Sequence, residues 1–125
     1  MDPVQHFQIP IDDVERAKKF YQEVFGWEIR SFPEINYHAI TTVPTDEQGH
    51  PTTPGGINGG LFERGTHGHD SISVVVTVES IDNCLTRIQL AGGKVAVPKT
   101  PVGGFGFFAQ LCDTEGNILG LWQNL

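Results

Sequence analysis

The feature that most constrains the fold is an approximate internal repeat with an offset of 67 residues. His6 and Ser73 each lie in an apolar segment with the character of a strand (73 − 6 = 67). Asp13 and Ser80 then stand before two segments with helical character, at the same offset (80 − 13 = 67). A strand, a capped helix and a glycine stop that recur at fixed spacing predict a duplicated supersecondary unit.

The first copy changes its hydrophobic period where the strand gives way to the helix. From Gln5 to Ile11 apolar and polar residues alternate, which is typical of a strand with one covered face. From Asp13 to Phe25 the period is helical, with Asp12 or Asp13 available as the N-cap and Gly26 as a suitable stop. The predicted apolar stripe of this helix comprises Val14, Ala17, Phe20, Tyr21, Val24 and Phe25.

The second copy repeats this order. Ser73 to Val78 is predicted as a strand, and Ser80 is the expected N-cap of a helix that runs to Ala91. The strand's predicted buried face is Val74, Val76 and Val78, and the helix's predicted stripe is Ile81, Cys84, Leu85, Ile88 and Ala91.

Three further strands are expected after each helix, which makes each half a βαβββ module. Module one covers about residues 4–66 and module two about 71–125, within a single domain spanning 1–125. Asp113 to Asn117 has the residues of a tight hairpin turn. Residues 45–56 have no periodicity and are predicted as a long connection, either a lid or slack chain. The further strands are predicted at 27–32, 37–43 and 57–62, then at 94–97, 107–112 and 118–123.

The length and net charge of the chain limit the size of its core and the kinds of molecule that it can bind. A chain of 125 residues with 38% hydrophobic content fits one core, and pairing with a second copy would add burial. The formal net charge is −7, with the basic residues scattered singly, which argues against binding to nucleic acid or to an anionic membrane. No leader or long apolar run is found, so we expect a cytoplasmic protein without a membrane span.

Several motifs in order resemble those of a known family. They are Asp13-Val14-Glu15-Arg16-Ala17 with Phe20-Tyr21, Phe25-Gly26-Trp27, Gly59-Gly60-Leu61, Ala91-Gly92-Gly93, and Asp113-Thr114-Glu115-Gly116-Asn117 with Gly120-Leu121-Trp122. With these motifs the chain resembles the vicinal oxygen chelate superfamily, which includes glyoxalase I, bleomycin-resistance proteins and extradiol dioxygenases. The resemblance implies an α+β fold of two βαβββ modules that form an open, cup-shaped mixed sheet with the helices outside. It also implies a ligand cavity and, frequently, a homodimer.

The resemblance also gives the positions at which metal-dependent members carry ligands. These positions are His6, Gly60, Ser73 and Gly120, and His6 alone keeps a typical ligand. Glycine has no side-chain donor, and a serine hydroxyl is a poor ligand for divalent transition ions. We therefore predict no metal and no other cofactor, and neither glyoxalase I nor extradiol dioxygenase activity.

The histidines are weaker candidates for catalysis or for metal binding. His6 lies on the strand face opposite Phe7 and Ile9, where it would be a hydrogen-bonding wall residue or, as a weak catalytic candidate, a general base. The stretch His67-Gly68-His69-Asp70 is predicted to be a polar linker, because structural metal sites need three or four ligands.

Alternation along the strands predicts the lining of a ligand cavity. Apolar walls with a few polar groups suit a small, partly aromatic organic molecule. The alternative is that the aromatic rings fill the space themselves. The predicted ligand-binding residues are His6, Gln8, Asn58, Phe62, Phe108, Gln110 and Trp122.

Three functions are consistent with these features. The first is a metal-independent protein that binds a small organic molecule, for example to sequester it in a resistance role. The second is an enzyme, lyase-like or dioxygenase-like, that uses His6 in acid–base chemistry or binds a divalent metal through His6 and non-standard ligands. The third is a dimeric interaction module without a ligand.

Overall fold

The computed structural model describes all 125 residues and has an α+β fold with eight strands and two α-helices. The chain divides into two compact units. We call residues His6–Ile72 the N-terminal unit, and Met1–Gln5 together with Ser73–Leu125 the C-terminal unit. No helix has the length and apolar character needed to cross a membrane.

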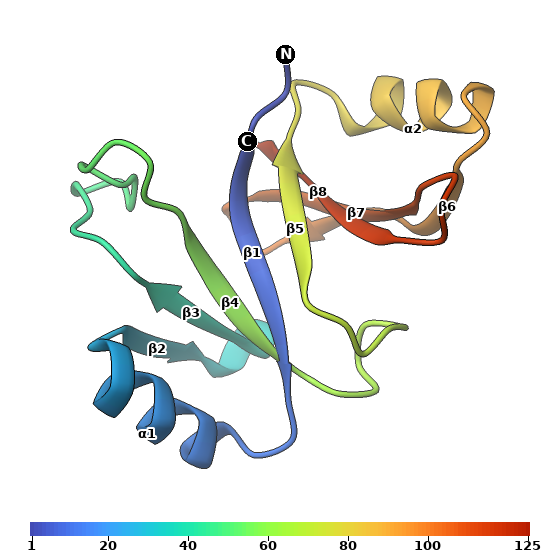
Figure 1. Cartoon of the computed structure of the whole chain (residues 1–125). Helices are drawn as coiled ribbons and strands as arrows, with labels where there is room; N and C mark the ends of the chain where they lie inside the picture. The colour runs from blue at the N-terminus through green and yellow to red at the C-terminus, as the bar shows by residue number, and fades with distance from the viewer. The chain divides into compact units, whose positions relative to one another are not determined.

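The N-terminal unit contains the first βαβββ module. Its strands lie in the order β2-β3-β4-β1, with β1 parallel to β4 and the other neighbours antiparallel (Figure 1). A short 3₁₀ helix, η1, which the sequence did not predict, joins β2 to β3. The elements are β1 (Val4–Ile11), α1 (Val14–Phe25), β2 (Glu28–Phe32), η1 (Pro33–Ile35), β3 (Tyr37–Thr41) and β4 (Asn58–Glu63).

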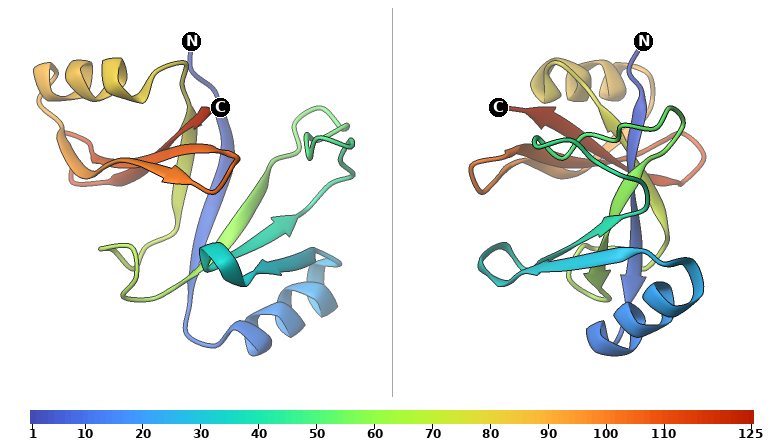
Figure 2. Two further views of the ribbon diagram at one scale, coloured as in Figure 1. Left: turned by 180° about the vertical axis from the view of Figure 1, so that it is seen from behind. Right: turned by 90° about the vertical axis from the view of Figure 1, so that its left-hand side faces the viewer.

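The C-terminal unit repeats this topology, with strand order β5-β8-β7-β6 and β5 parallel to β8. Figure 2 shows α1 alongside the sheet of the first unit and α2 alongside the sheet of the second. The elements are β5 (Ser73–Thr77), α2 (Ile81–Leu90), β6 (Lys94–Val102), β7 (Gly106–Cys112) and β8 (Ile118–Asn124).

The predicted repeat is confirmed down to the register of the strands. Gln8 of β1 is paired with Gly60 of β4, and Val75 of β5 is paired with Gly120 of β8. Gln8 and Val75 are 67 residues apart (75 − 8 = 67), which is the offset found in the sequence. The two modules therefore place a glycine at the same point of an equivalent parallel strand pair.

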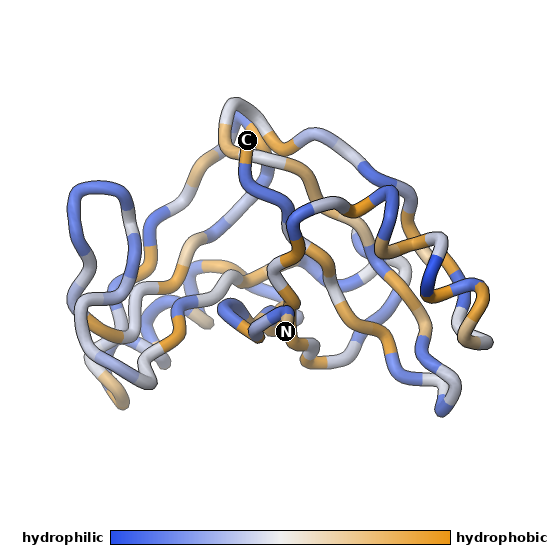
Figure 3. Tube along the Cα trace, turned by 90° about the horizontal axis from the view of Figure 1, so that it is seen from above, coloured by the Kyte–Doolittle hydropathy of each residue, from blue (hydrophilic) through white to orange (hydrophobic).

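Each unit has its own core between the sheet and the helix, and hydrophobic stretches lie along the strands in Figure 3. The predicted stripe of the first helix is partly wrong, because Phe20, Val24 and Phe25 are 54%, 54% and 59% exposed. Successive helical residues are about 100° apart, so the sheet reaches only part of a wide stripe. The residues of α1 that pack on the core are Val14, Ala17 and Tyr21.

The second module differs from prediction in two strands. Val74 is exposed rather than buried, while Val75, on the other face of β5, is 2% exposed. The strand predicted at residues 94–97 continues through Pro98 and Pro101 to Val102, with two register shifts between Val95 and Thr100. An edge strand tolerates proline because one side needs no partner, and β6 is an edge strand.

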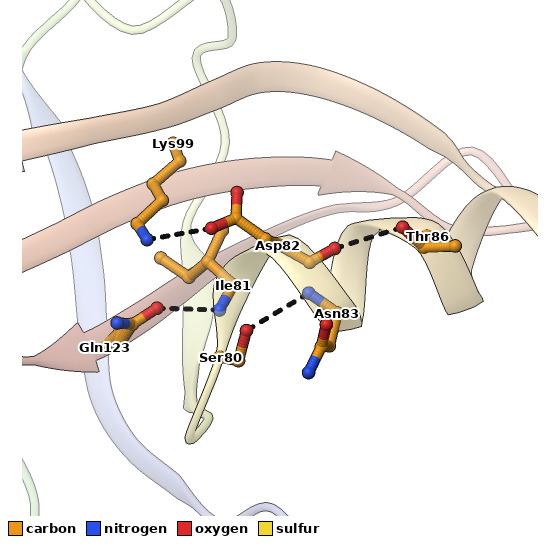
Figure 4. Close-up of polar contacts among 7 residues, drawn as sticks. All are labelled: Ser80, Ile81, Asp82, Asn83, Thr86, Lys99 and Gln123. Carbon is orange, nitrogen blue, oxygen red and sulfur yellow. Dashed lines mark hydrogen bonds and ion pairs between the residues drawn. The ribbon is translucent and has the colours of Figure 1, made fainter.

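Both predicted helix starts are confirmed. Asp13 accepts a hydrogen bond from Arg16 N at 2.9 Å, and Ser80 accepts one from Asn83 N at 3.2 Å. Gln123 of β8 also accepts a bond from Ile81 N, which ties α2 to the sheet (Figure 4).

Two connections have the predicted character. Asp113 closes the hairpin between β7 and β8 by accepting bonds from the backbone N–H groups of Glu115 and Asn117. Residues 45–56 form no regular strand or helix, but Asp46 organises a turn by accepting bonds from Gln48 N and His50 N at 2.9 Å. That this connection acts as a lid stays a prediction.

Candidate functional site

Strand β1 separates the core of the N-terminal unit from a polar face. Phe7 and Ile9 pack against the cluster beneath α1. Side chains alternate along a strand, so His6 and Gln8 lie on the opposite face, as the sequence predicted. We call this side of the N-terminal unit the His6 face.

On this face His6 contacts a residue that the sequence had not singled out. The Tyr37 hydroxyl of β3 lies 2.9 Å from His6 Nε2 and donates to Gly59 O at 3.3 Å. Burial lowers the pKa of His6 from 6.5 to about 4, because removal from water disfavours the charged imidazolium. Burial raises the pKa of Tyr37 for the corresponding reason. Both groups are therefore neutral at pH 7.

The Tyr37 ring also fills the space beside Gly60. A Cβ atom added at Gly60 would lie 2.6 Å from Cε2 and 2.7 Å from Oη of Tyr37. On the other sheet face, a Cβ atom at Gly59 would lie 2.5 Å from the ring of Phe7. The two glycines of β4 are thus covered by aromatic rings from opposite sides, and neither position has room for a side chain.

The residues at the family's metal positions do not fit a divalent ion. Gly60 lacks a donor, and Tyr37 occupies the space that an acidic side chain would need. At Gly120 a Cβ atom would lie 2.9 Å from both Phe108 and Val75. The chain gathers no three His, Cys, Asp or Glu side chains that could hold an ion.

Asn58 and Gln8, two other predicted residues on the His6 face, differ in their hydrogen bonding. The side-chain oxygen of Asn58 accepts a hydrogen bond from Thr42 N at 2.9 Å and so holds the end of β3. Gln8 is 7% exposed, and its Oε1 atom is buried without a hydrogen-bond partner. A buried polar group without a partner is costly, so Gln8 marks this face as a place where a ligand would gain a hydrogen bond.

Phe62 is covered by the segment that follows β4. It is 3% exposed, and its ring centroid lies 4.7 Å from that of His67 and 5.4 Å from that of His69. The stretch predicted as a polar linker therefore packs on Phe62. Burial, and to a smaller extent the nearby His69, lowers the pKa of His67.

The remaining predicted residues lie on one face of the C-terminal unit. Phe108 is paired with Trp122, and Gln110 is paired with Gly120. Trp122 covers Gly106 and donates its indole N–H to Asn124 at 2.8 Å. Gln110 is 2% exposed. These residues are brought together as the alternation predicted, and their role in binding stays a prediction.

A shallow apolar groove lies on the other side of the N-terminal unit. Its volume is about 440 Å³, and its lining includes Phe7, Ile9, Trp27 and Ile57. Phe7 and Ile9 point away from the His6 face, so this groove is not the site predicted from the sequence.

Sequence reasoning missed Tyr37 because it contacts His6 across 31 residues of chain. One signal was available. Two successive glycines in a strand leave both faces bare, and an aromatic residue from a neighbouring strand commonly fills such a gap.

Comparison with known proteins agrees with these observations. Residues 4–42 match the family model for the bleomycin resistance protein-like N-terminal region. A candidate glyoxylase of Mycobacterium bovis is 25% identical over 122 residues, which cover 89% of this chain. The chain spans about two fifths of that relative's length, because the match covers 41% of it.

Solved structures of low sequence identity share the fold. A glyoxalase/bleomycin resistance protein/dioxygenase superfamily member from Vibrio splendidus has a TM-score of 0.64 at 12% identity, covering 99% of this chain and 100% of that one. Methylmalonyl-CoA epimerase from Mycobacterium tuberculosis has a TM-score of 0.66 at 12% identity, covering 98% and 87%. The protein therefore has the glyoxalase-like fold, and its first 42 residues include a segment similar to the N-terminal region of bleomycin resistance proteins.

Proposed function

We propose that the protein binds a small organic molecule on the His6 face without a metal ion, in a sequestering or resistance role. The observation that carries this proposal is the position of Tyr37. Its hydroxyl bonds to Nε2 of the one histidine at a family ligand position, and its ring fills the space beside Gly60.

Polar atoms on this face support a binding role. The ring nitrogen Nδ1 of His6 has no protein hydrogen-bond partner, and it is not among the buried atoms that lack one, so solvent can reach it. Gln8 adds a buried oxygen without a partner. A few such polar groups are what orients a small ligand in a binding site.

The second candidate is an enzyme that uses His6 as a general base. Two observations favour it: the imidazole is neutral at pH 7, and one of its nitrogens has no protein partner. The epimerase among the structural neighbours adds the precedent of a catalyst with this fold. In this case a bound compound would be converted, whereas a sequestering protein would release it unchanged.

The test combines metal analysis with ligand titration. Protein purified without chelator or affinity tag is expected to contain no stoichiometric transition metal. A library of small aromatic and carbonyl compounds is then titrated by protein NMR, with mass spectrometry of the recovered compound to detect conversion. An ion bound at His6 would contradict metal independence, and a converted compound would favour the enzyme.

Further parts of the proposal concern the whole chain. The lining predicted around Trp122 in the C-terminal unit is a separate part of the proposal: for a ligand bound there, we expect Trp122→Ala to weaken binding and added salt to change it little, because that lining is aromatic and uncharged. A homodimer, a cytoplasmic location and a single domain formed by both modules also remain proposals. If no compound binds and the protein is dimeric, the interaction module without a ligand becomes the better explanation.

A further inference from the structure

The hydrogen bonds of Tyr37 determine where the proton of His6 lies. A phenol hydroxyl has one proton to donate, yet Oη of Tyr37 has two neighbours: Gly59 O at 3.3 Å and His6 Nε2 at 2.9 Å. If the proton is directed to the carbonyl, His6 must donate from Nε2 to Oη. Both contacts are then hydrogen bonds, whereas the opposite arrangement leaves one of them unmade.

The Nε2–H tautomer turns the other ring nitrogen into an acceptor. In a neutral imidazole one nitrogen donates and the other accepts. Tyr37 therefore leaves His6 Nδ1 with a lone pair, and this is the nitrogen that has no protein partner.

Gln8 supplies a second acceptor by an independent observation. Its Oε1 atom is buried and without a partner, and the side chain is 7% exposed. Residues two apart on a strand lie on the same face, roughly 6 to 7 Å from each other. The side chains of His6 and Gln8 thus lie next to each other on the His6 face, and each carries an acceptor atom without a protein partner.

We infer that the His6 face selects uncharged molecules that carry N–H or O–H donors, such as primary amides, and rejects anions such as carboxylates. This inference rests on the proposed binding function and adds its ligand class. A carboxylate would bring only acceptors to two atoms that need donors, and the group that contacts His6 is a neutral phenol, which cannot compensate a negative charge. Arg30 of β2 lies on the same sheet face, but three strands away from β1, and its guanidinium stacks over the Phe32 ring.

The first arm of the test needs no ligand. In the full chain at pH 7, long-range ¹H–¹⁵N NMR reports which ring nitrogen of His6 is protonated. We expect Nε2–H in the wild type and a mixture of tautomers in Tyr37→Phe, which keeps the ring over Gly60 but loses the hydroxyl. Tyr21→Phe is the matched control, because Tyr21 stacks on Trp27 within the same unit and has no contact with His6. A wild-type signal from Nδ1–H would overturn the inference.

The second arm compares benzamide, N,N-dimethylbenzamide and benzoate, which share a ring and a carbonyl but differ in donors and charge. We expect benzamide to bind about tenfold more tightly than either of the others, in line with the loss of one hydrogen bond. Gln8→Leu should reduce this preference and leave the His6 tautomer unchanged.

The outcomes separate this inference from the proposed function. Equal or tighter binding of benzoate or the dimethyl compound would overturn the ligand class and leave the binding function standing. Binding of none of the three, together with none of the wider library, would overturn both.

Discussion

The two modules have the same backbone plan and different chemistry on equivalent faces. In each, a glycine of the last strand is paired with a residue of the first strand and covered by an aromatic ring. In the N-terminal unit these are Gly60, Gln8 and Tyr37, and in the C-terminal unit they are Gly120, Val75 and Phe108. The aromatic residues themselves correspond, since each lies two positions before the residue that pairs with the glycine, namely Ala39 or Gln110.

The difference shows what a duplicated fold holds constant. The backbone register and the ring over the glycine are needed for packing, so both modules keep them. The polar atoms are not needed for packing, and they differ between the modules: the buried polar residues are Gln8 in the first module, and Ser73 and Gln110 in the second. His6, Gln8 and the Tyr37 hydroxyl have as their counterparts Ser73, Val75 and a phenyl ring. The contact between an imidazole and a phenol hydroxyl therefore has no counterpart at the equivalent positions of the C-terminal unit, and it makes the His6 face the first place to search for function.

The largest expected effect comes from the two cores. Leu61 and Leu121 are 0% and 2% exposed at equivalent places in the two units. Leu61→Ala and Leu121→Ala should each lower the free energy of unfolding by about 2–5 kcal/mol. Calorimetry then tests the single domain. If the modules unfold together, either substitution shifts one common transition, and two separate transitions would contradict the single domain.

The next effect is a pH dependence that comes from His6. Its pKa is about 4 in the folded protein and 6.5 when exposed, so between these values the unfolded state binds more protons. Stability should therefore fall as the pH is lowered from 6.5 towards 4, by at most about 3 kcal/mol from this group. Urea unfolding of wild type and His6→Gln across this range isolates the contribution. An unchanged pH slope in the variant would show that His6 does not cause it.

A smaller loss of stability is expected when a methyl group is added at the glycine that packs against Tyr37 or Phe108. A Cβ atom would lie 2.6 Å from Tyr37 at Gly60, and 2.9 Å from Phe108 and Val75 at Gly120. Neither glycine has a positive φ, so the cost is steric. Gly60→Ala and Gly120→Ala should each destabilise by about 1–3 kcal/mol, with Gly60→Ala the more severe. Adding Tyr37→Ala should remove the clash at Gly60, and strict additivity in this double-mutant cycle would argue against it.

The smallest effect comes from exchanging the hydroxyl between the modules. Tyr37→Phe should lower stability by about 1 kcal/mol, because it removes the bonds to His6 and Gly59. Phe108→Tyr should cost less, because Ser73, the counterpart of His6, has a buried hydroxyl without a partner. Chemical denaturation of both variants gives the comparison. A greater loss for Phe108→Tyr would mean that the two faces are not equivalent.

Local sequence signals predicted most of the architecture. Changes of period, the cap Ser80 and the turn at Asp113 depend on neighbouring residues, so a single sequence suffices to find them. For the first helix the sequence left Asp12 and Asp13 as alternatives, and the structure shows that Asp13 is the cap. The extent of β6 was missed because proline is tolerated at an edge, and edge position is a property of the whole sheet.

Burial and long-range contacts were harder to predict. The apolar residues of α1 mark a stripe, but which of them meet the sheet depends on how the helix lies across it, and Phe20 and Val24 do not. The predicted site included His6 and Gln8 by alternation alone. Tyr37 could not be inferred in the same way, because its contact with His6 depends on the register of β3, β4 and β1 together.

At the glycine pair of β4, only the backbone lies between two aromatic rings on opposite faces of the sheet. The Phe7 ring packs against Gly59 on the core face, and the Tyr37 ring packs against Gly60 on the His6 face. Because neither glycine has a side chain that could absorb a displacement, we expect a shift of the Phe7 ring to move the β4 backbone and with it the Tyr37 ring, whose hydroxyl contacts His6. Under the proposed binding function, substitutions around Phe7 beneath α1 would therefore change the position of Tyr37 and His6, and with it ligand preference, without altering any residue that contacts the ligand.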